Sequence, residues 1–159
     1  MTEHGIAPVY DELSEILILG SFPSVQSRAR GFFYSNPNNR FWMVLTMLYQ
    51  EEPLNSIEEK IAFLLRRRIA VYDTILRCDI KGSSDSSIKN VVPADLQEMI
   101  QNSRIRRVFT NGKLAHKLYR QYQLPLTGIE DVNLPSTSSA NASYHLEQLL
   151  ECWRILKAD

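Results

Sequence analysis

Short apolar runs alternate with longer amphipathic stretches along this chain. Four of the runs are rich in Val, Ile and Leu and end at turn residues, as strands buried on both faces do. The stretches between them carry apolar residues three or four positions apart, which is the spacing of helices. The expected strands are 16–19, 69–72, 107–110 and 132–134; the expected helices are 40–49, 57–68, 113–122 and 142–156, with a short helix opened by Pro93. Strands separated by helices predict a three-layer α/β/α sandwich around a four-stranded, mainly parallel sheet.

The length and composition fit one domain. The chain has 159 residues, of which 44% are apolar, and no linker divides it. This is enough to bury one hydrophobic core, so we expect a single domain over residues 1–159. The 18 basic and 18 acidic residues cancel. No global positive field then attracts a polyanion, and any surface that binds one must be local.

Several features limit the expected cellular compartment of the protein and the cofactors it could hold. The start of the chain places acidic groups ahead of a short apolar run, unlike a signal peptide, and no run reaches the roughly 20 apolar residues of a membrane span. Cys78 and Cys152 form no Cys-x-x-Cys pair, and the three histidines lack the spacing of metal ligands. We therefore expect a cytoplasmic protein without a membrane segment, a metal or another cofactor.

Polar, irregular segments follow each predicted strand. They are 20–24, 73–74, 111–112 and 135–139. Any one of them could simply form a turn or a helix cap. The carboxyl ends of parallel strands, however, meet at one edge of a sheet, which is where such folds bind ligands. The four segments together therefore predict one pocket.

Two of these segments resemble the motifs of a known family. The first reads Gly-Ser-Phe-Pro-Ser over 20–24 and continues over 31–42 as Gly-Phe-Phe-Tyr-Ser-Asn-Pro-Asn-Asn-Arg-Phe-Trp. The second reads Leu-Pro-Ser-Thr-Ser-Ser-Ala over 134–140. They resemble the first and second motifs of the uracil-DNA glycosylase superfamily, and the Asn-Arg-Phe-Trp run is similar to that of its mismatch-specific uracil/thymine glycosylases. The order and separation of the motifs also match, so the resemblance covers nearly the whole chain.

Two positions depart from most of that superfamily. The residue before the motif-one proline is Phe22, where most members have an Asp or Asn that handles the attacking water. The residue before Pro135 is Leu134, where some relatives use a histidine to stabilise a departing uracil oxygen. A phenylalanine at this position resembles the pattern of the hypoxanthine-DNA (deoxyinosine) glycosylase branch. In that branch the asparagine before Arg-Phe-Trp is the main catalytic residue. In this sequence that asparagine is Asn39.

An asparagine suits the chemistry that this resemblance implies. Cleaving an N-glycosidic bond develops positive charge on the sugar and negative charge on the leaving base. Once the bond has mostly broken, an amide that orients a water can replace a carboxylate base, and we expect Asn39 to do so. An amide also matches the O6 acceptor and N1–H donor of hypoxanthine. Asn111 could make that contact, or it could serve only the backbone of an Asn-Gly turn.

The resemblance also implies residues for the walls of the site. A base rotated out of the duplex stacks on an aromatic ring. Tyr34 occupies the position at which related enzymes have that ring, and Phe22 could line the pocket beside it; either ring could instead belong to the core. Asp73 stands where uracil-specific relatives keep a base-reading asparagine, or it caps a helix. The expected phosphate contacts are Ser24, Arg28, Ser136 and Ser138.

Two loop features are left open by the sequence. Ser138 stands where relatives often insert a leucine wedge into the DNA, and serine is a poor wedge. The Gly/Ser stretch 82–87 resembles segments of deoxyinosine-type sequences and either borders the pocket or is a flexible loop.

These features predict a monofunctional DNA glycosylase that hydrolyses the N-glycosidic bond of deaminated bases, chiefly hypoxanthine, in base excision repair. It would act as a monomer on DNA containing deaminated bases. No lysine lies in a motif position, so a Schiff-base lyase step is not expected. One alternative is a mismatch-specific uracil/thymine glycosylase, which Phe22 opposes. The other is a relative that binds damaged DNA without cleaving it.

Overall fold

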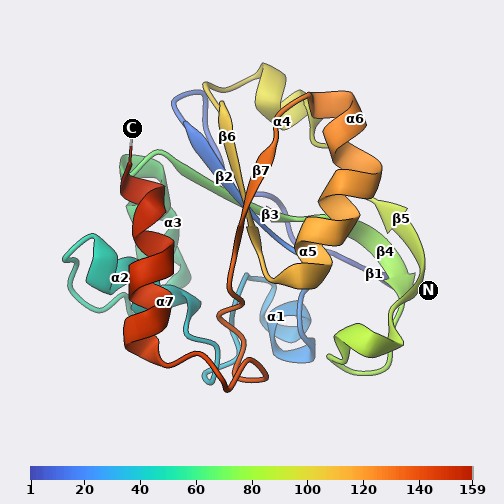
Figure 1. Cartoon of the computed structure of the whole chain (residues 1–159), viewed down its shortest axis with the longest axis horizontal. Coiled ribbons are helices and arrows are strands. Elements are labelled where there is room, and N and C mark those ends of the chain that lie inside the picture. Colours follow the sequence, from blue (N-terminus) through green and yellow to red (C-terminus); the bar gives the residue numbers. More distant parts are fainter. Residues whose placement is uncertain (159) are drawn as a thin grey trace.

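A four-stranded parallel sheet forms the centre of the molecule (Figure 1). The computed structural model describes residues 1–158. The strands lie in the order β3-β2-β6-β7, and every neighbouring pair is parallel. Their bounds are β2 (Ile16–Gly20), β3 (Ile69–Asp73), β6 (Arg107–Asn111) and β7 (Asp131–Leu134). The four strands expected from the sequence are thus confirmed, each to within one residue at either end.

Helices cover both faces of this sheet, with one set on each side in Figure 1. The first set is α2 (Phe41–Leu48), α3 (Ile57–Arg66) and α7 (Leu146–Trp153), and the second is α4 (Gln97–Gln101), α5 (Lys113–Leu118) and α6 (Leu124–Thr127). In β2, Ile16 and Ile18 point into the core beneath the first set. Leu17 and Leu19 point into a second core beneath the other set. The continuous apolar run of β2 is explained because both of its faces are buried, and the predicted α/β/α sandwich is confirmed.

A second sheet of three antiparallel strands is absent from the sequence prediction. It consists of β1 (Thr2–Glu3), β4 (Ile75–Asp79) and β5 (Lys89–Pro93), in the order β1-β4-β5. Most of its residues are exposed or half-buried, so its strands lack the apolar run that marks a strand. The prediction that Pro93 opens a helix is wrong: it pairs with Ile75 at the end of β5, and α4 begins at Gln97. A proline is accepted there because β5 is an edge strand.

The last helix is shorter than the sequence predicts. The helix expected over 142–156 begins at Leu146. The carbonyl groups of Asn141 and Tyr144 accept hydrogen bonds from the Arg40 guanidinium, so the segment before α7 is held by tertiary contacts instead of helical ones. The remaining short elements are α1 (Val25–Arg30), η1 (Asp85–Ser87), η3 (Arg154–Lys157) and η2 (Tyr119–Gln123), a π-helical turn that completes the expected helix 113–122.

A buried pair of polar side chains connects the two sheets. His4 follows β1 and Asp73 ends β3, and Nε2 of the imidazole lies 2.7 Å from Oδ2 of the carboxylate. The backbone N–H of Ile6 donates to Nδ1 of His4, so Nε2 carries the imidazole proton and donates it to Asp73. The two side chains are 1% and 5% exposed. This hydrogen bond therefore replaces the water that the carboxylate loses on folding.

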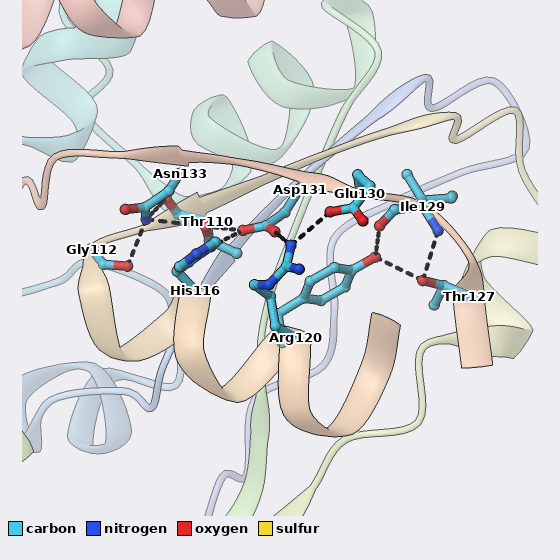
Figure 2. Close-up of polar contacts among 10 residues, drawn as sticks. Thr110, Gly112, His116, Arg120, Thr127, Ile129, Glu130, Asp131 and Asn133 are labelled. Carbon is cyan, nitrogen blue, oxygen red and sulfur yellow. Dashed lines mark hydrogen bonds and ion pairs between the residues drawn. The ribbon is translucent and has the colours of Figure 1, made fainter. Parts of the chain in front are cut away.

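Polar contacts attach the edge strand β7 to its neighbours (Figure 2). Oδ2 of Asp131 lies 2.6 Å from both Oγ1 of Thr110 and Nδ1 of His116. The amide of Asn133 donates to the carbonyl groups of Thr110 and Gly112, at 3.3 and 2.9 Å. Gly112 lies between β6 and α5, so these bonds fix the place where β6 ends and a polar loop begins.

Replacing His4 by alanine should lower the free energy of unfolding by about 3 kcal/mol, because the Asp73 carboxylate would stay buried without its donor. Urea unfolding measures the loss. Glu3→Ala is the matched control, since Glu3 is an exposed residue of the neighbouring β1, and it should change the stability by less than about 0.5 kcal/mol. Equal losses in the two variants would contradict the role given to the buried pair.

Candidate active site

A cleft of about 360 Å³ opens at the carboxyl ends of the parallel strands. The last residues of three strands line it: Gly20 of β2, Asp73 of β3 and Asn111 of β6. The loop after β7 contributes 136–138, and the loops around α1 and η1 supply the other walls. The polar segments that follow the predicted strands therefore meet in one cleft, as the sequence indicates.

Tyr34 reaches the cleft from the loop after α1. Its backbone lies in the left-handed region, with φ of 52°. Its ring stacks on Phe41 with centroids 3.8 Å apart and planes 14° from parallel. A bulky residue in this region carries about 1–3 kcal/mol of strain, which persists where the surroundings fix it. The stacking fixes Tyr34, and its hydroxyl accepts a hydrogen bond from Nδ2 of Asn111 at 3.3 Å.

Gly20 leaves no room for a side chain between its neighbours. A Cβ at this position would lie 2.5 Å from Oδ1 of Asp73 and 2.9 Å from the hydroxyl of Tyr34. Neither neighbour can move aside at little cost, because His4 holds the carboxylate and Phe41 holds the ring. The motif-one glycine is therefore required by this close approach.

A chain of hydrogen bonds joins the two motifs. The backbone N–H of Thr137 donates to Oδ1 of Asn111 at 3.0 Å, and Nδ2 of Asn111 donates back to Oγ1 of Thr137 at 3.0 Å. The hydroxyl of Thr137 then donates to Oδ1 of Asn39 at 2.8 Å. The backbone N–H of Phe41 donates to the same oxygen at 2.9 Å. Asn39 is thus hydrogen-bonded to a residue of each motif, Phe41 and Thr137. Asn111 uses both its carbonyl oxygen and its NH₂ group in this chain of hydrogen bonds.

Two tryptophans hold the motif loops from behind. The indole N–H of Trp42 donates to the carbonyl of Phe33 at 3.2 Å. The indole N–H of Trp153, whose side chain is fully buried, donates to the carbonyl of Pro135 at 2.9 Å. Each loop is therefore attached to a helix of the first core, α2 in one case and α7 in the other.

Comparison with known proteins identifies the family of this chain. The sequence profile of the uracil DNA glycosylase superfamily matches residues 7–157. The chain belongs to that superfamily. Two relatives named hypoxanthine DNA glycosylase, from Methanosarcina acetivorans and Methanosarcina barkeri, are 34% and 33% identical to it over 150 and 148 residues. The alignments cover 91% and 89% of this chain, and the same shares of the relatives.

A solved structure agrees with the family assignment. It is the solution NMR structure of a protein from Methanosarcina acetivorans, named as a candidate uracil DNA glycosylase. The two structures superpose with a TM-score of 0.81 at 31% sequence identity, and the match covers 99% of each chain. The superfamily fold therefore extends over the whole sandwich and is not confined to the motifs.

This superfamily member brings nearly all of its predicted site residues to the cleft. Those that line it are Phe22, Ser24, Tyr34, Asn39, Asp73, Asn111, Ser136 and Ser138. Arg28 does not line it: its guanidinium donates to the carbonyl groups of Pro23 and Gly82 and lies 5.5 Å from the ring centre of Phe22. Which of these residues contact a base or a phosphate stays a prediction.

Several residues of the cleft were not singled out from the sequence. Thr137 is fully buried and carries the central hydroxyl of the hydrogen-bond chain. Thr137 lies between Ser136 and Ser138, which were both predicted site residues, and this position was the available signal. Asn36 is another such residue. Residues 83–86 also line the cleft, and they belong to the Gly/Ser stretch 82–87, for which the sequence left two interpretations open. The Gly/Ser stretch thus borders the pocket, which was one of its two open interpretations.

The serines of the two motifs hold the loop backbone. Ser24 caps α1 by accepting the N–H of Ser27 at 3.1 Å. Ser136 accepts the N–H of Ser138 at 3.1 Å, and Ser138 accepts that of Ala140 at 3.2 Å. Within residues 1–158, Ser136 and Ser138 accept these hydrogen bonds, and neither donates its own hydroxyl proton to another group. Both hydroxyls can therefore donate to a ligand at the rim of the cleft.

The acidic groups of the site perturb one another. Burial raises the pKa of Tyr34 far above its ordinary value, and the negative charge of Asp73 raises it further, against a smaller opposite effect of the Asn111 hydrogen bond. Asp85 is an exposed residue that lines the same cleft. Its partial burial and the nearby Asp73 raise its pKa. Asp85 therefore takes up a proton more readily than a free carboxylate at the mouth of the cleft.

The described part of the chain offers no metal centre. Within residues 1–158, no three His, Cys, Asp or Glu side chains gather as ligands for a metal ion. Over the same residues, no helix is long and apolar enough to cross a bilayer.

The Tyr34 phenol makes the stability of this superfamily member pH-dependent in alkali. Because the pKa is raised in the folded state, the unfolded chain releases the proton near pH 10 while the folded chain retains it, so stability is lost as pH rises above about 10. Tyr34→Phe should remove the part of this loss that Tyr34 causes, about 1.4 kcal/mol per pH unit, and leave the parts caused by Tyr49, Tyr72 and Tyr119. Urea unfolding at about pH 9, 10 and 11 measures it. Tyr144→Phe, at an exposed position, should follow the wild type; parallel curves for all three proteins would refute the assignment.

Proposed function

We propose that this protein is a monofunctional DNA glycosylase that releases hypoxanthine from DNA in base excision repair, acting as a monomer in the cytoplasm. The observation that carries the proposal is that Asn39 and Phe22 line the same cleft. A phenyl ring has no hydrogen-bonding group for the reaction, so the chemistry needs another polar side chain, and Asn39 supplies one. The names of the two relatives that match about nine-tenths of this chain support hypoxanthine as the substrate.

The reaction is hydrolysis of the bond between C1′ of the deoxyribose and N9 of the base. The electron pair of that bond leaves with the purine, which takes up a proton. The oxygen of a water molecule bonds to C1′ and loses its own proton. The products are free hypoxanthine and an abasic site. Positive charge on the sugar and negative charge on the base develop in the transition state, so hydrogen-bond donors to the base and a placed water lower the barrier.

The cleft fits a purine that has been rotated out of the duplex. Its volume of about 360 Å³ is within the range of small-molecule sites, about 300–1,000 Å³. The ring of Tyr34, with Phe41 stacked behind it, and the ring of Phe22 supply aromatic surface for stacking. Asn39 lies in the same cleft as both rings.

The rim of the cleft serves the DNA backbone. Ser136 and Ser138 each accept a backbone N–H, and within residues 1–158 neither donates its hydroxyl proton. Each can therefore donate that proton to a phosphate oxygen. Such contacts fix the register of the nucleotide without reading its sequence. They are local, which agrees with a net charge of zero for the whole chain.

Single-turnover cleavage of a duplex containing one deoxyinosine tests the proposal. The wild type should release hypoxanthine and leave an alkali-labile site. Asn39→Ala should be slower by roughly a hundred- to thousandfold, the usual cost of removing a preorganised polar group from a transition state. Asn38→Ala is the matched control, since Asn38 is an exposed neighbour of the same residue type, and it should cleave at the wild-type rate.

The same assay with deoxyuridine and mismatched thymine distinguishes the alternatives. A wild type that cleaves uracil far faster than hypoxanthine would make the protein a mismatch-specific glycosylase. Tight binding of the damaged duplexes without cleavage of any of them would make it a binding protein.

A further inference from the structure

The hydrogen bonds around Asn39 determine which of its polar atoms is free. Oδ1 accepts the backbone N–H of Phe41 and the hydroxyl of Thr137. A carbonyl oxygen has two lone pairs, so this atom is fully used. Within residues 1–158, Nδ2 has no acceptor, and it is not a buried atom left without a partner. Since Asn39 lines the cleft, the atom that it offers there is a donor.

The orientation of this amide is fixed by groups that can only donate. The backbone N–H of Phe41 requires Oδ1 of Asn39 on its side. At the other end of the chain, the backbone N–H of Thr137 requires Oδ1 of Asn111, which leaves Nδ2 of Asn111 facing the Thr137 hydroxyl. Because the Phe41 N–H places Oδ1 of Asn39 opposite this hydroxyl, the hydroxyl donates its single proton to that oxygen. Rotating the Asn39 amide by a half turn would place its N–H groups against the backbone N–H of Phe41, which can only donate.

We infer that Asn39 donates a hydrogen bond from Nδ2 to the departing base, and that Thr137 is the residue that positions it. The inference rests on the proposed function and specifies the role of one residue in it. The purine anion carries lone pairs at O6, N3 and N7. An N–H donor binds this anion more strongly than the intact base, so it stabilises the transition state selectively.

The donor role replaces the water-orienting role expected for Asn39 from the sequence. To hold an attacking water by its proton, the amide would need a free acceptor, and Oδ1 has none left. Thr137 itself is fully buried. Its hydroxyl proton is donated to Oδ1 of Asn39, so Thr137 acts on the reaction through Asn39, although it also lines the cleft.

Asn39→Asp separates the two roles. Aspartate keeps an oxygen for the Phe41 N–H and the Thr137 hydroxyl, but it places a second oxygen where the N–H donor was. A donor role predicts that Asn39→Asp is as slow as Asn39→Ala on the deoxyinosine duplex, roughly a hundred- to thousandfold below the wild type. A rate within about tenfold of the wild type would overturn the inference, because a carboxylate can hold water and cannot donate.

Thr137→Val and Thr137→Ser test the positioning residue. Valine has the shape of threonine without the hydroxyl, and serine retains the hydroxyl. Thr137→Val should lower the single-turnover rate at saturating enzyme by at least about tenfold without changing the half-saturating enzyme concentration. Thr137→Ser should recover most of that loss. Equal rates for the two variants would show that the hydroxyl has no part in catalysis.

A double variant tests whether Thr137 acts through Asn39. Thr137→Val should slow the Asn39→Ala protein no further, because residues that act as one unit are not additive. The same fold-loss in both backgrounds would overturn the positioning role. Thermal unfolding of each variant verifies folding at the assay temperature; if Thr137→Val does not fold, Thr137→Ala replaces it in the comparison with Thr137→Ser, and Asn39→Asp still decides the donor role.

The outcomes distinguish this inference from the proposed function. A wild type that releases no hypoxanthine overturns the proposed function and the inference with it. A wild type that releases hypoxanthine, together with an equally active Asn39→Asp variant, overturns the inference alone.

Discussion

The hydroxyl of Thr137 joins two residues that are 98 positions apart in the sequence. One of them, Asn39, lies just before α2, and Thr137 itself lies in the loop after β7. No covalent or local constraint brings these segments together, so the sheet must place the end of β7 opposite the start of α2. The Arg40 guanidinium, which binds carbonyl groups of the segment before α7, adds a second connection between the same loops. The shape of the cleft follows from these contacts.

Close packing at the ends of β2 and β3 constrains the opposite side of the cleft. Gly20 has no space for a Cβ because the Asp73 carboxylate and the Tyr34 hydroxyl approach it so closely. Asp73 can be buried there only because His4, from outside the main sheet, donates to it. The small antiparallel sheet thus contributes to the site without lining it. A polar group at the centre of the molecule is retained where its partner is also fixed.

The sequence was sufficient for the main sheet and for most of the site. Each central strand is a continuous apolar run, and such runs are visible because both faces of the sheet are buried. The strand ends then determine which loops meet, which is why Tyr34, Asn39 and Ser136 could be expected in one cleft. The strands β1, β4 and β5 lack that signal because they are largely open to solvent.

The direction of a hydrogen bond was beyond the reach of the sequence. The two asparagines of the hydrogen-bond chain, Asn39 and Asn111, could be recognised from the sequence as polar groups at the end of a motif or a strand. Which atom of each amide is used depends on backbone N–H groups of Phe41 and Thr137, which tertiary structure alone brings within reach. Thr137 escaped notice for a related reason: its hydroxyl is buried between two residues that approach only in the folded chain.

The two tryptophans give this protein a built-in optical reporter. The sequence contains no others, and each uses its indole N–H on a carbonyl of one motif loop, Trp42 on Phe33 and Trp153 on Pro135. The emission of an indole is sensitive to the polarity and hydrogen bonding of its surroundings. The ultraviolet fluorescence of the unlabelled protein therefore reads the backbone directly behind each wall of the cleft. Movement of either loop as DNA enters becomes visible without attaching a dye to a molecule whose two cysteines lie at one buried and one exposed position.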